Sequence, residues 1–168
     1  MELPHLTAVT LALTAVFMDL SQGIIPNGLT VSGAVAGLVF NVLTHGLVEG
    51  VRNALGGMGL GLGLMLPLFL LGGMGGGDIK LLASIGAWVG PPQVFCIIVY
   101  GSFVGGLACL YLLIRTNRLS ALNRLGADVR LFMKIRTRLE PKKDSLTIPY
   151  SLPIAAGTIL GTFLGNCL

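Results

Sequence analysis

Residues 53–97 read NALGGMGLGLGLMLPLFLLGGMGGGDIKLLASIGAWVGPPQVFCI, and this stretch decides the fold. Two apolar runs, 53–71 and 79–97, are each about as long as a helix that crosses a bilayer. Between them, five glycines in six positions (Gly72, Gly73, Gly75, Gly76 and Gly77) precede the charged Asp78. Glycine disfavours helix and permits tight turns. The pattern predicts two membrane helices joined by a turn that ends in a carboxylate.

The composition extends this interpretation to the whole chain. Apolar residues make up 54% of it, charged residues 11%, and the mean hydropathy is +0.86, whereas about a quarter of the residues in soluble domains are charged. We therefore predict an all-α fold, a polytopic membrane helix bundle of about six transmembrane helices in a single domain over residues 1–168. The apolar stretches lie at about 5–20, 28–48, 53–71, 79–97, 98–114 and 148–167. If Gly90-Pro91-Pro92 breaks the chain, the fourth helix is too short for a full span.

The positive charges predict the orientation. Nine of the eleven Lys and Arg residues fall within the loop at about 115–147, between the fifth and sixth spans. Positively charged loops stay in the cytoplasm, so we expect this loop there. With six spans, the turns holding Asp19–Pro26 and Gly72–Lys80 then lie on the cytoplasmic side as well. Glu49 and Arg52, with Gly90-Pro91-Pro92, lie on the other side.

The basic loop also carries apolar residues at roughly helical spacing. Examples are Leu122, Leu125, Val129 and Phe132. This spacing favours an amphipathic helix on anionic membrane lipid, with a partner or substrate as the alternative. Because no recognition motif accompanies the charges, nucleic acid is not an expected partner.

Glycines elsewhere recur every four residues, as in Gly57 with Gly61, Gly101 with Gly105, and Gly157 with Gly161. This spacing is typical of closely packed membrane helices. The cysteines, Cys96, Cys109 and Cys167, form no CxxC pair and are interpreted as packing residues.

Asp19 and Asp78 each have a structural alternative: an interfacial acid at a span end, or an N-cap for a helix starting at Ile79. Their predicted position on one face favours a joint role. At a separation of about 4.5 Å, two carboxylates repel by roughly 3 to 4 kcal/mol at an effective dielectric near 20, so the pair would share one proton. Such a pair can activate water for attack on a peptide carbonyl, without a metal or another cofactor. His5 and His45 fall on the other predicted side and are not expected to take part.

Two motifs resemble a known family. Gly75-Gly76-Gly77-Asp78-Ile79-Lys80-Leu81 is similar to the GxGDxKL motif of the type IV prepilin peptidases, which are intramembrane GxGD aspartic proteases. Asp19 followed by Ile25-Pro26-Asn27 resembles their first motif, and Ile148-Pro149-Tyr150 resembles a segment that opens their last span. The nearest likeness is to the short, peptidase-only form of tight-adherence pilus systems and to the archaeal preflagellin peptidases.

The resemblance implies an aspartic endopeptidase with Asp19 and Asp78 as its catalytic pair. Its substrate would be a prepilin or pilin-like precursor, cut at the cytoplasmic face of the inner (cytoplasmic) membrane of a prokaryote. Larger members carry an N-terminal segment with paired CxxC motifs and also methylate the pilin. This chain starts directly with its first span, so no methyltransferase activity is expected.

Five further residues are expected to bind substrate or support the site. Gly75 and Gly77 would let the backbone approach a ligand closely. Lys80 would either extend to the interface as a snorkelling cation or act in the site, by holding the ionised form of Asp78 or by engaging the precursor. Pro26 would break the chain, and Asn27 would cap the second span.

A small proton- or cation-coupled transporter that uses the two aspartates is the main alternative, followed by a scaffold subunit packed by its glycines. A transporter predicts acids near the bilayer midplane and polar groups on several helices. Here the acids lie at span ends.

Overall fold

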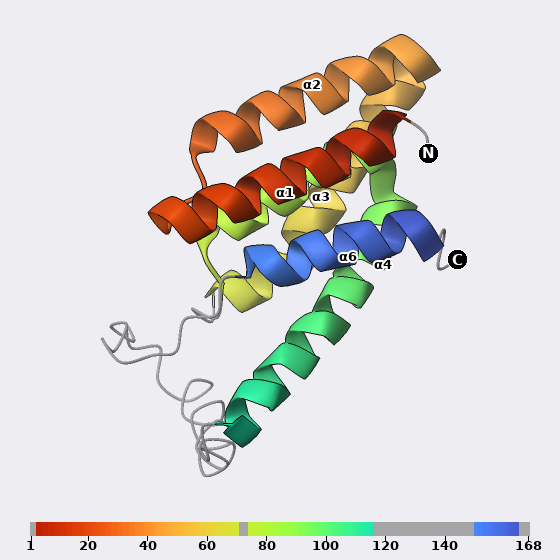
Figure 1. Ribbon diagram of the computed structural model, residues 1–168. Helices are drawn as coiled ribbons and strands as arrows, with labels where there is room; N and C mark the ends of the chain where they lie inside the picture. The colour runs from red at the N-terminus through yellow and green to blue at the C-terminus, as the bar shows by residue number, and fades with distance from the viewer. Residues whose placement is uncertain (1–2, 71–73, 116–149, 165–168) are drawn as a thin grey trace. The chain divides into compact units, whose positions relative to one another are not determined.

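Five helices make up the part of the chain that this computed structural model describes, residues 3–70, 74–115 and 150–164. They are α1 (Leu3–Gln22), α2 (Asn27–His45), α3 (Leu47–Leu70), α4 (Gly76–Arg115) and α6 (Ser151–Leu164) (Figure 1). These ranges contain no strand. The prediction of an all-α fold is therefore confirmed.

The chain divides into two compact units, Met1–Gly105 with Pro149–Leu168, and Gly106–Ile148. The first unit holds α1, α2, α3, most of α4 and α6. Almost all of the basic segment at 115–147 lies outside the described residues. The predicted amphipathic helix and its contact with anionic lipid fall in that segment and stay predictions, as does the single domain.

Among the described helices, four are long and apolar enough to cross a bilayer: α1, α2, α3, and α4 over Gly76–Tyr111. The fifth described helix, α6, is apolar but has only 14 residues. Because α4 contains an internal break, these helices are compatible with about six spans. The chain is a multi-pass membrane protein.

The break in α4 lies at Gly90, where φ is 79° and ψ is 176°. Glycine adopts a positive φ at little cost, and Pro91 and Pro92 lack the N–H groups that would continue the helical bonding. The boundary expected from hydropathy between residues 97 and 98 is therefore wrong. The part before the break, 76–89, rises about 21 Å, less than the roughly 30 Å of a hydrocarbon core. This agrees with a short fourth helix.

The first half of α4 lies at the centre of its unit. Every residue from Leu81 to Ala87 is buried. The hydrophobic core around it includes Ala8, Ala12 and Ala15 of α1. The helix that carries Asp78 is therefore enclosed by other helices just beyond its first turn.

Glycines bring the helices into close contact, as their spacing predicts. A Cβ added at Gly57 of α3 would overlap the carbonyl oxygen of Gly86 in α4. A Cβ at Gly157 of α6 would lie 2.6 Å from the backbone nitrogen of Gly101. No larger residue fits at these two positions without a shift of the backbone.

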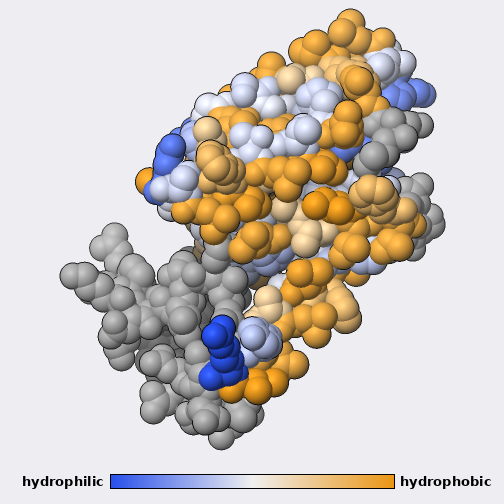
Figure 2. Space-filling model, in the orientation of Figure 1, coloured by the Kyte–Doolittle hydropathy of each residue, from blue (hydrophilic) through white to orange (hydrophobic). Residues whose placement is uncertain are grey.

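Large hydrophobic side chains are exposed along the helices, among them Phe17, Val35 and Leu62. Figure 2 shows the hydrophobic colour over much of the visible surface of the described helices. In water such a surface would be costly, whereas in a bilayer it contacts lipid chains.

Candidate active site

Asp19 and Asp78 come together from two helix ends. Asp19 lies in the last turns of α1, and Asp78 lies in the first turn of α4. The two carboxyl groups are close enough for the charge of Asp19 to act on Asp78. Ile25, in the turn after α1, also packs against Gly77. The structure therefore places the two predicted residues in one site.

Asp78 is held by the glycine turn that precedes it. Its side chain is 9% exposed, and its carboxylate accepts a hydrogen bond from the backbone N–H of Gly75. The other oxygen, Oδ1, is buried and has no hydrogen-bond partner among the described residues. The N-cap alternative is wrong, because α4 begins at Gly76 rather than at Ile79. The glycine turn thus holds one oxygen of Asp78, and the other makes no hydrogen bond to the described residues.

Asp19 is held from another direction, by α6. The Ser151 hydroxyl donates a hydrogen bond of 2.5 Å to Asp19 Oδ2. Ser151 is the first residue of α6 and is fully buried, while Asp19 is half-buried. Sequence reasoning missed Ser151. The signal that could have found it is the neighbouring Ile148-Pro149-Tyr150 segment, which ends one residue before it.

The entry to α2 differs from its prediction. Pro26, with extended backbone angles, is the N-cap, and α2 makes no side-chain capping bond. Asn27 is already the first helical residue, so the prediction that it caps the helix is wrong. Its Oδ1 instead accepts a hydrogen bond of 2.9 Å from Lys80 Nζ. This bond connects the start of α2 to the start of α4.

Lys80 is exposed. In the described ranges, no ion pair joins it to either aspartate, so a direct hold on Asp78 is absent there. Through Asn27 it connects the two segments that carry the predicted motifs.

The two supporting glycines have close neighbours. A Cβ at Gly75 would lie 3.1 Å from Asp78 Oδ2, and a Cβ at Gly77 would lie 3.1 Å from Ile25 Cβ. Gly75 therefore leaves room for the Asp78 carboxylate, and Gly77 for the segment after Asp19.

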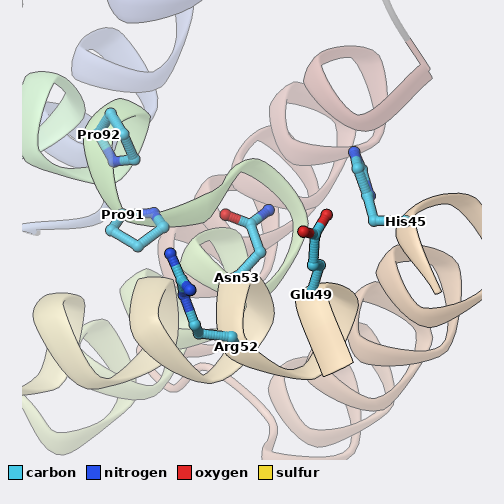
Figure 3. Close-up of a pocket in the computed structure, with 6 residues that line it drawn as sticks. All are labelled: His45, Glu49, Arg52, Asn53, Pro91 and Pro92. Carbon is cyan, nitrogen blue, oxygen red and sulfur yellow. The ribbon is translucent and has the colours of Figure 1, made fainter. Parts of the chain in front are cut away.

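A second polar cluster lies at the other end of these helices. His45, Glu49, Arg52 and Asn53 line a hollow of about 510 Å³ together with Pro91 and Pro92 (Figure 3). The residues predicted opposite the aspartates thus lie near one another. In the part of the chain that the structure covers, no three His, Cys, Asp or Glu residues are placed to hold a metal.

The family follows from the match to a sequence profile. The profile of the type IV leader peptidase family matches residues 6–110, more than half of the chain and including both aspartates. The chain belongs to this family. The resemblance seen in the two motifs is therefore confirmed at the level of the family. Ser151 lies beyond the matched residues.

Individual relatives agree with the family match, and each is described as a prepilin leader peptidase/N-methyltransferase. The protein of Aeromonas hydrophila is 36% identical over 117 residues, covering 67% of this chain and 40% of the relative. That of Neisseria gonorrhoeae is 32% identical over 120 residues, covering 67% and 41%. That of Burkholderia pseudomallei strain K96243 is 38% identical over 114 residues, covering 61% and 36%.

The chain thus spans about two fifths of the length of these relatives. No solved structure matches it.

Proposed function

We propose that this protein is an intramembrane aspartic endopeptidase that removes the leader peptide from type IV prepilins or pilin-like precursors. One observation carries the proposal: Asp19 and Asp78 share a site, and Asp78 Oδ1 is buried there without a partner among the described residues. Family membership supports it. A buried carboxylate oxygen without a partner is costly unless a further group occupies the site. A water molecule is the group that this chemistry requires.

The two carboxyl groups divide the work in hydrolysis. One is ionised and takes a proton from water as the water attacks the scissile carbonyl carbon. The other is protonated and donates a hydrogen bond to the carbonyl oxygen, on which negative charge develops. The proton then passes to the leaving amine as the carbon–nitrogen bond breaks. The reaction consumes one water and needs no other reactant.

We also propose that the site faces the cytoplasm of a prokaryotic inner membrane. The support is the charge distribution, since eight of the eleven basic residues fall within the segment between α4 and α6, and a ninth, Arg115, ends α4. That segment connects to α6 at Ser151, beside Asp19. A precursor cut there would keep its leader in the cytoplasm and its hydrophobic helix in the membrane.

Cleavage in a purified system tests the proposal. The protein in detergent is mixed with a prepilin that carries its basic leader, and products are identified by mass spectrometry. We expect two fragments, with unchanged rates in the presence of a metal chelator. Folded protein that leaves the prepilin intact would contradict the proposal. If the protein instead carried protons or cations across proteoliposome membranes under a pH gradient and did not cleave prepilin, the result would favour the transporter.

Methyl transfer is a separate question, because the relatives combine both activities in their descriptions. The three cysteines of this chain form no CxxC pair. We propose that it cleaves without methylating. Prepilin incubated with labelled S-adenosylmethionine should release its leader and stay unlabelled, whereas a labelled pilin would refute this part.

Replacing Gly75 with alanine is expected to lower kcat about tenfold. The new Cβ would lie 3.1 Å from Asp78 Oδ2, so the carboxylate must move by a few tenths of an ångström, and small displacements of reacting groups reduce rates strongly. The matched control is Gly76→Ala, whose Cβ would make only an ordinary contact, 3.6 Å from Phe69 Cε2. Initial rates of prepilin cleavage compare the two variants. Equal rates would show that Gly75 does not shape the site.

A further inference from the structure

The contact between Ser151 and Asp19 joins residues 132 positions apart. Their oxygens are 2.5 Å apart, which is in the range of strong hydroxyl–carboxylate hydrogen bonds. Ser151 has no exposed surface. The bond as a whole is partly buried, and a bond with limited access for competing water holds a carboxylate in one orientation more firmly than an exposed bond does.

The position of Ser151 is set by its helix. Ser151 opens α6, and Ile154 and Ala155 of the same helix belong to the buried core that includes Ala12 and Ala15 of α1. The helix that supplies the donor is therefore packed against the helix that carries the acceptor. Groups on packed helices are held more precisely than groups on loops.

Each aspartate thus has one carboxylate oxygen held by a separate part of the chain. The Ser151 hydroxyl donates a hydrogen bond to Asp19 Oδ2. The backbone N–H of Gly75 donates one to the Asp78 carboxylate, whose Oδ2 lies close to Gly75. A side chain with two rotatable bonds, such as aspartate, can turn away from a reacting group when such a partner is removed. The alignment of the pair with water then depends on both partners.

We infer that Ser151 is a positioning residue for this reaction: its hydroxyl orients the Asp19 carboxylate toward the shared site. The inference rests on the proposed function, because it requires Asp19 to act in catalysis. It adds a residue from α6 to a site otherwise built from α1 and α4. Ser151 does not touch the substrate and acts through Asp19.

Three serine variants and one aspartate variant test the inference in the full chain. Ser151→Ala should lower kcat for prepilin cleavage by 10- to 100-fold and leave KM within twofold. Ser151→Thr keeps the hydroxyl and should recover most of kcat. The matched control is Ser84→Ala, because Ser84 is also fully buried but its hydroxyl has no partner among the described residues. It should stay within twofold of the wild type.

The outcomes separate this inference from the proposed function. If Asp19→Asn is inactive but Ser151→Ala keeps the wild-type kcat, the role of Ser151 is overturned and the aspartate pair is not. Asp19→Asn that still cleaves would overturn the aspartate pair itself. If Ser151→Ala loses kcat and thermal midpoint together, or Ser151→Thr is no better than alanine, Ser151 has a packing role and the inference is wrong.

Discussion

Replacing either aspartate with asparagine is expected to lower kcat by about 1,000-fold or more. General acid and base groups typically contribute 10²- to 10⁴-fold each. Asparagine has nearly the same shape as aspartate, yet it can neither take a proton from water nor pass one to the amine. Asp19→Asn and Asp78→Asn should therefore bind prepilin with little change in affinity and fail to cut it. Separate assays of binding and of cleavage in detergent measure the two properties.

The control for these variants is Glu49→Gln. Glu49 is an exposed acid in the hollow at the other end of the helices, where it lies with Arg52. Its replacement removes one negative charge without touching the pair, so the cleavage rate should stay within twofold. If Asp19→Asn or Asp78→Asn cleaves as fast as Glu49→Gln, the two aspartates are not the catalytic pair.

Replacing Gly57 with alanine is expected to destabilise the protein by about 1 to 3 kcal/mol, the usual cost of forcing an extra carbon into a packed interior. The added Cβ would overlap the carbonyl oxygen of Gly86. That oxygen is backbone, so α3 and α4 must separate. Thermal unfolding in detergent, followed by circular dichroism, measures the effect as a lower midpoint.

The matched control is Gly59→Ala, two residues along the same helix. A Cβ at Gly59 would meet no atom within 4 Å, so only the gain in helix propensity remains, up to about 1 kcal/mol. Its midpoint should stay the same or rise. Equal losses in both variants would mean that α3 does not depend on its contact with Gly86.

The sequence predicted the site best where simple rules act over the whole chain. Hydropathy and the positive charges placed Asp19 and Asp78 at one end, with Glu49 and Arg52 at the other, because each span reverses the side of the membrane. The structure agrees: the segment after Asp19 lies against Gly77, next to Asp78, and Glu49 and Arg52 lie together near Pro91 and Pro92. The glycine spacing likewise predicted close contacts, which depend on the lack of a side chain and on little else.

Glycine and proline residues predict the ends of the helices better than average hydropathy does. The boundary near residue 97 failed because the residues on both sides of Gly90 are apolar, so the hydropathy does not change at the break. Gly90-Pro91-Pro92 predicts the observed break, because glycine allows a positive φ and the two prolines lack the N–H groups of a helix. The prediction that Asn27 caps α2 is wrong by one residue, because the extended backbone of Pro26 already supplies the cap position.

Ser151 shows what sequence patterns leave out. Its bond to Asp19 depends on how α6 packs against α1, and no spacing rule connects residues 132 positions apart. The same holds for Asp78 Oδ1, which is buried without a partner among the described residues. Its burial depends on the neighbouring helices, which the local sequence does not specify. Both features decide how the pair is held, and both required the structure.

The enclosure of the first half of α4 has a consequence for how the bilayer acts on this protein. Residues 81–87 are all buried, whereas α1 exposes large side chains such as Leu13 and Phe17. A thicker or thinner bilayer changes the tilt of helices that touch lipid. In this protein α1 also packs into the buried core around α4, and Ser151 of α6 holds Asp19. We therefore expect the two carboxyl groups to keep their spacing when the bilayer thickness changes, because a tilt of α1 would have to carry this shared core with it.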